Sequence, residues 1–276
     1  MDKYAPPTPQ ARPLQLNLWW LTASLIALNV GLFLWQISTG MNASHPSIQD
    51  AIAWGADYAP LTFLAEPQRL FTSMFFHFGL IHLMMNMWAL FLFGKITEQM
   101  LGRGYFIGLY LLAGLMGSLL SAVLDFRQSA LLIEQQQIVT ELLPKVGAGA
   151  SGAVMGLGGA LTILALLPVL PQQRFILDKK TLLIVMGINL MIGFMTAGIN
   201  NTAHIGGLIM GACLALAWYI ATKYHARIVK ILGLLFGCGL CIGLYAYCMA
   251  MLDLVAPLWQ ELLSVMQQRF AGQSLH

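Results

Sequence analysis

The stretch GYFIGLYLLAGLMGSLLSAVL, residues 104–124, decides the fold class of this chain. It contains no Asp, Glu, Lys or Arg, and most of its residues are apolar. A helix needs about 20 apolar residues to cross a hydrocarbon core of roughly 30 Å. The stretch therefore predicts a membrane-spanning helix, flanked by the charged residues Arg103 and Asp125.

The rest of the chain follows the same pattern. Of its 276 residues 58% are hydrophobic and 9% are charged, with a mean hydropathy of +0.74, whereas soluble domains carry roughly 25% charged residues. The uncharged run 181–222 would form a helix about 63 Å long, so it must turn back near residues 196–201. We predict an all-α polytopic membrane protein with outer loops at 38–69 and 125–147. Its seven spans are predicted at 16–37, 70–94, 104–124, 149–168, 181–197, 203–222 and 231–252.

The distribution of Lys and Arg predicts the orientation, because cytoplasmic segments hold the excess of these residues. With the N-terminus inside, ten of the 14 Lys and Arg fall in inner segments. The four in outer segments are Arg69, Arg127, Lys145 and Arg269. We expect a cytoplasmic N-terminus and an outer C-terminus. The net charge of +3 then reflects short basic inner loops, and no nucleic-acid partner is expected.

Polar side chains inside the predicted spans indicate a functional site, since each one costs free energy in lipid. They are His77, His82, Asn86, Ser151, Asn189 and His204, with no Asp or Glu among them. A two-aspartate protease needs carboxylates within its spans, and a His-Glu-x-x-His zinc site needs two imidazoles and a base on one helix. Neither is present. A hydroxyl nucleophile with an imidazole base remains, with Ser151 and His204 as the pair.

The surroundings of Ser151 favour this interpretation. Ser151 lies at the start of its predicted helix, where free N–H groups and the helix dipole stabilise a developing oxyanion. Small neighbours let a substrate backbone approach its oxygen, so Gly149 is expected to line the substrate site. His82 and Asn86 are spaced i, i+4 and share one helix face, which makes them candidate oxyanion-hole donors.

Three structural interpretations stay open at this point. Ser151 could belong to a small-residue packing face that includes Gly152 and Gly156, and His204 could serve packing with the glycines that follow it. The three histidines of the spans could bind a metal, but no carboxylate or Cys stands at ligand spacing. No metal and no cofactor are therefore expected.

The motifs around these residues resemble those of the rhomboid intramembrane serine proteases. Gly149-Ala-Ser-Gly152 is similar to the nucleophile motif of that family, and Ala203-His-Ile-Gly-Gly207 is similar to its general-base motif. His82-x-x-x-Asn86 is similar to its oxyanion pair, and Gly94-x-x-x-Glu98-x-x-x-Gly102 matches the pattern after its second core helix. At the family's Trp-Arg pair, this chain has Gln68 and Arg69, so the anchoring of the first outer loop is expected to differ.

The resemblance implies a cytoplasmic segment at 1–15, a six-helix catalytic core at 16–222, and an extra transmembrane helix with an outer tail at 223–276. It implies a serine endopeptidase with a Ser151–His204 dyad and an oxyanion hole of His82, Asn86 and the Ser151 N–H. Its partners would be the bilayer and single-span membrane proteins, cut near the outer end of their span. The alternative is a rhomboid-like protein that binds such clients without cleaving them.

The location follows from the same observations. Short loops and the lack of a targeting signal favour a multi-pass protein of the cell inner (plasma) membrane. The sequence indicates no oligomeric state.

Overall fold

The computed structural model describes residues 18–169, 180, 182–184, 186–187, 190–191 and 201–273. In these residues the secondary structure is helical, apart from one isolated antiparallel bridge between Asp57 and Gly147. Five helices are long and apolar enough to cross a membrane, and α7 (Ser151–Leu166) is a shorter apolar helix. The five are α1 (Trp20–Ser38), α5 (Leu80–Leu101), α6 (Arg103–Gln135), α10 (Asn201–Lys223) and α11 (Ile228–Ala250). The prediction of an all-α polytopic fold is confirmed.

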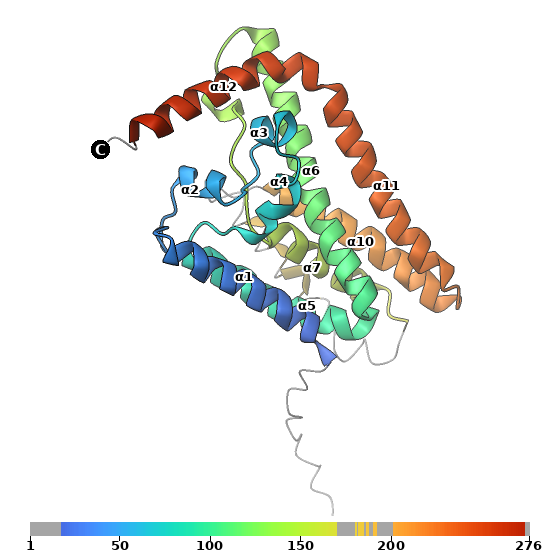
Figure 1. Ribbon diagram of the computed structural model, residues 1–276. Helices are drawn as coiled ribbons and strands as arrows, with labels where there is room; N and C mark the ends of the chain where they lie inside the picture. The colour runs from blue at the N-terminus through green and yellow to red at the C-terminus, as the bar shows by residue number, and fades with distance from the viewer. Residues whose placement is uncertain are drawn as a thin grey trace, which may run out of the picture.

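Helix α7 forms the centre of the bundle. Every residue from 152 to 161 is buried, and α5, α6 and α10 pack around the helix (Figure 1). Glycine makes this possible, because a Cβ on Gly207 would overlap the Gly152 carbonyl oxygen, and one on Gly211 would overlap that of Gly156. Helices pack this closely only where side chains are absent. Gly152 and Gly156 therefore do form a packing face.

The second predicted span is wrong by about ten residues at its start. Residues 70–79 do not continue α5; they form α4 (Arg69–Thr72), the 3₁₀ turn η2 (Ser73–Phe75) and a short extended segment. The break falls at Gly79, whose φ of +96° suits a residue without a side chain. At its other end α5 continues past Lys95 to Leu101, because the Lys95 ammonium lies over the Phe91 ring and Glu98 has buried hydrogen-bond partners.

Two segments predicted as outer loop or tail are helical. Helix α6 continues through residues 125–135, and residues 252–273 form α12 (Leu252–Gln273). The extension of α6 buries Phe126, Ser129 and Leu132 along one face, and the fully buried Trp259 of α12 packs there. Charged residues marked the predicted limits of the spans, but this buried stripe continues the helix beyond them.

Some predicted segments fall outside the described residues. They are the N-terminal segment 1–15, most of the fifth span at 181–197 with Asn189, and all of the predicted turn 196–201 except its last residue.

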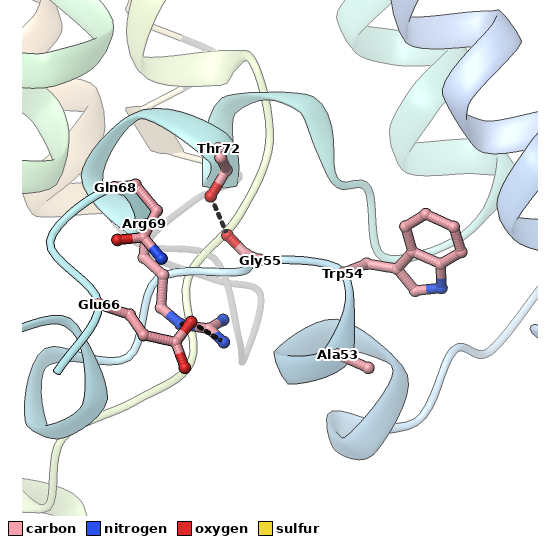
Figure 2. A pocket seen from close by; sticks show the side chains of 7 residues that line it. All are labelled: Ala53, Trp54, Gly55, Glu66, Gln68, Arg69 and Thr72. Atoms are coloured by element: carbon pink, nitrogen blue, oxygen red, sulfur yellow. Dashed lines mark hydrogen bonds and ion pairs between the residues drawn. The ribbon is translucent and has the colours of Figure 1, made fainter.

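The loop between α1 and α5 is folded rather than extended. It contains α2 (Ile48–Ala53) and α3 (Ala59–Leu64) before α4. Arg69 is buried and donates through Nη1 to the carbonyl oxygens of Ile52 (2.8 Å) and Ala56 (2.9 Å). Glu66 accepts from the Arg69 Nε, and Figure 2 shows these two side chains in contact. Thr72 Oγ1 donates to the Gly55 carbonyl at 2.8 Å. Arg69 thus anchors the loop in the absence of a Trp at position 68.

Candidate active site

The structure brings Ser151 and His204 together from two helices. Ser151 is the first residue of α7, and His204 lies in the first turn of α10. His204 Nε2 lies 2.8 Å from Ser151 Oγ. This is the distance at which an imidazole can accept a hydroxyl proton. His204 is 7% exposed and Ser151 is partly exposed, so the hydroxyl can be reached while the ring is held by its surroundings.

Helix spacing fixes this distance. Gly207 lies one turn after His204 and sits directly against the Gly152 carbonyl of α7. On α6, a Cβ at Gly117 would lie 2.7 Å from the carbonyl oxygen of Ala203, the residue before His204. Both contacts involve backbone, which cannot rotate away. The glycines therefore bring the Ser151 and His204 side chains within hydrogen-bonding distance.

No acid orients the imidazole in the described part of the chain, where His204 Nδ1 has no hydrogen-bond partner. Helices α5 and α6 extend past the predicted spans, and the extensions contain Glu98 and Asp125. Glu98 is occupied elsewhere, since it accepts from the N–H groups of Leu21 (3.1 Å) and Thr22 (2.8 Å) at the start of α1. Packing therefore holds the His204 ring.

His82 and Asn86 lie one turn apart on α5. His82 Nδ1 accepts from the Phe78 N–H at 3.2 Å, which leaves Nε2 free to carry a proton. Asn86 is buried, and its amide nitrogen donates to the His82 carbonyl at 3.0 Å. An amide nitrogen carries two donor hydrogens, so one remains available for a ligand.

Gly149 places the nucleophile loop beside His82. Its φ is +119°, a conformation that favours glycine, and a Cβ there would lie 2.8 Å from His82 Cε1. Its N–H donates to the Ser73 carbonyl at 2.9 Å. Two residues earlier, Gly147 and Asp57 exchange a pair of main-chain hydrogen bonds, each 2.8 Å long. The loop that leads into Ser151 is thus tied to the segments preceding α3 and α5.

His77 also belongs to this network, although no sequence pattern indicated its partner. It is fully buried, and its Nε2 accepts from the Ala150 N–H at 3.5 Å. Its ring meets the His82 ring edge-on at 5.3 Å. Burial lowers the pKa of His77 to about 3, so it is a neutral acceptor at ordinary pH. The sequence indicated that His77 needs a hydrogen-bond partner, but only the fold shows that this partner is the N–H of Ala150, the residue before Ser151.

Comparison with known proteins relates the chain to one family. Residues 65–223 match the rhomboid domain. The chain is 34% identical over 197 residues to rhomboid protease GluP of Bacillus subtilis; the match covers 71% of this chain and 34% of that protein. It is 27% identical over 223 residues to rhomboid protease AarA of Providencia stuartii, covering 76% of each. It is 30% identical over 224 residues to the mitochondrial RHOMBOID-like protein 6 of Arabidopsis thaliana, covering 71% of this chain and 67% of that one.

Proposed function

The chain belongs to the rhomboid family, a multi-pass membrane protein family, and from this premise we propose that it is an intramembrane serine endopeptidase with Ser151 as nucleophile and His204 as general base. One observation carries the proposal: the 2.8 Å separation of His204 Nε2 and Ser151 Oγ. Relatives named as rhomboid proteases support the same chemistry.

The proposed reaction uses the contact between the two side chains. His204 takes the Ser151 proton as Oγ attacks the scissile carbonyl, and the imidazolium then returns it to the leaving amine. Water, activated by the same imidazole, hydrolyses the acyl-serine and regenerates the hydroxyl. With no carboxylate on Nδ1 within the described residues, the ring depends on packing for its orientation.

The oxyanion would lie at the start of α7, against His82, Asn86 and the Ser151 N–H. The first N–H groups of a helix have no partner within it; the N–H of Val154 is the first of α7 to bond back, to Ala150 O. Gly149 supports the approach of a substrate backbone, since a side chain there would occupy space beside His82.

The substrates we propose are single-span membrane proteins cut near the outer end of their span. A bond inside a helix in lipid is already hydrogen-bonded, so the substrate must unwind where it meets Ser151. We also propose a cytoplasmic N-terminus and an outer C-terminus, from the distribution of Lys and Arg. The short loops support residence in the cell inner (plasma) membrane. Reporter proteins fused after residues 146 and 225 should then lie on opposite sides of the membrane.

The test uses the full chain reconstituted in liposomes with a single-span test substrate. Ser151→Ala and His204→Ala should each abolish cleavage, while Ser38→Ala and His225→Ala, at exposed positions, should leave it unchanged. Cleavage that survives in either site variant would refute the dyad.

A rhomboid-like protein that binds clients without cleaving them would give a different result. The wild-type chain would capture the test substrate uncut, and Ser151→Ala would capture it equally well. Both site residues are present and in contact, which favours cleavage.

A further inference from the structure

An aromatic cluster joins the C-terminal helices to the loop between α1 and α5. The Phe63 ring of α3 meets the Phe126 ring of α6 at 5.0 Å and the Tyr245 ring of α11 at 5.7 Å. Phe126 in turn contacts Trp259 of α12 at 4.4 Å. In Figure 1, α12 crosses over the end of α6 and lies beside α3. The cluster therefore links α3 and α6 to the two consecutive C-terminal helices α11 and α12.

Trp259 is the anchor of α12 in this cluster. It is the largest fully buried side chain in the described residues, and its indole N–H donates to Ser129 Oγ at 2.8 Å. Val255, one turn earlier on the same face, is also fully buried. A helix that packed only against lipid would not need a specific hydrogen bond to α6. The position of α12 is thus specified by hydrogen bonding as well as by packing.

The other end of α3 leads to the candidate nucleophile. Asp57 precedes α3, and its carboxylate accepts from Thr62 Oγ1 within that helix at 2.6 Å. The main chain of Asp57 is bonded twice to Gly147, four residues before Ser151. A shift of α3 would be passed through Asp57 to the loop that sets the position of the serine.

We propose that α12 is a positioning element for the active site, with Trp259 holding α3 so that the Asp57–Gly147 bridge keeps the Ser151 loop in place. This inference rests on the proposed function. Trp259 does not touch the reacting atoms; it acts through Phe126, Phe63 and α3. A purely stabilising α12 would instead affect only α12 and the end of α6.

Hydrogen exchange on the full chain separates these two roles without requiring activity. We expect Trp259→Ala to accelerate exchange at the Asp57, Gly147 and Gly149 amides as well as in α12. The control is Leu254→Ala on the same helix, because Leu254 is 54% exposed, and exchange at the three amides should stay as in the wild type. Trp259→Phe keeps a ring against Phe126 but loses the indole donor to Ser129, so exchange at the three amides should rise less than in Trp259→Ala.

Kinetics with the single-span test substrate provide the second measurement. Misplacement of a catalytic group by 1 Å can cost about 100-fold in rate, so a partial shift should lower kcat about tenfold and leave KM unchanged. Exchange that rises only in α12 and the end of α6, or an unchanged kcat beside faster exchange at Gly147, would overturn the proposal.

Further variants keep the proposal testable if Trp259→Ala does not fold. Ser129→Ala removes the acceptor of the indole hydrogen bond, and Phe63→Leu removes the ring of α3 that contacts Phe126. Both should accelerate exchange at the same three amides, but less than Trp259→Ala does. If the wild-type chain proves inactive, the proposed function fails, while exchange at Gly147 still decides the structural coupling.

Discussion

Gly117→Ala tests whether the spacing of α6 and α10 sets the distance between Ser151 and His204. The new Cβ would lie 2.7 Å from the Ala203 carbonyl oxygen, where an ordinary contact begins near 3.4 Å. The obstacle is backbone on both sides, so no rotamer relieves it. Helix α10 must therefore move by about 0.7 Å at the residue next to His204.

The expected loss of rate follows from this displacement. Since a 1 Å error can cost about 100-fold, 0.7 Å should lower kcat by roughly 10- to 30-fold, or about 1.4–2 kcal/mol in the barrier. Overpacking of this kind also destabilises a protein by about 1–3 kcal/mol, so a lower unfolding temperature should accompany the slower rate.

The assay is steady-state cleavage of the single-span test substrate in liposomes, with thermal unfolding followed in parallel. Gly104→Ala is the matched control, because Gly104 lies on the same helix and a methyl group added there would have no atom within 4 Å. It should keep the wild-type kcat and gain slightly in stability. A folded Gly117→Ala that retains kcat within about twofold would refute the reasoning that helix spacing fixes the dyad.

The remaining predictions concern one residue each. Asn86→Ala should lower kcat by about 100- to 1,000-fold with little change in KM if its amide binds the oxyanion; a loss confined to KM would contradict that role. Burial raises the pKa of Asp57 to about 6, although the hydrogen bond from Thr62 and the positive charge of Arg69 both lower it. The wild type should therefore lose stability as pH rises from about 4 to above 6, relative to Asp57→Asn; equal pH dependence of the two unfolding temperatures would count against this. Glu98→Gln should destabilise the protein by about 1–3 kcal/mol by weakening the hydrogen bonds at the start of α1, and it should leave kcat unchanged in the same cleavage assay.

The limits of the helices show where prediction from sequence failed. Charged residues marked the predicted ends of the spans. Glu98 nevertheless lies inside α5, because N–H groups at the start of α1 donate hydrogen bonds to its carboxylate. Asp125 lies inside α6 because Phe126 and Ser129 continue a buried stripe against Trp259. In both cases the partner comes from a distant part of the chain, so no local pattern could have located it.

The sequence predicted the residues of the candidate site from the few polar residues in an apolar chain: Ser151, His204, His82 and Asn86. The structure brings Ser151 and His204 into contact. The support of the nucleophile loop could not be predicted in this way. The contacts of Gly147 with Asp57 and of Ala150 with His77 join segments that are far apart in the sequence.

The sequence by itself determined that this chain lies in lipid, that it is helical and that its motifs resemble those of rhomboid proteases, because hydropathy and short motifs are local properties. Only the tertiary structure decided that Ser151 and His204 meet at 2.8 Å, that glycine contacts hold α6, α7 and α10 at that spacing, and that α12 is tied to α3 and α6. The physical reason is that helix spacing and loop anchoring depend on contacts between distant segments. These form only when the whole bundle packs.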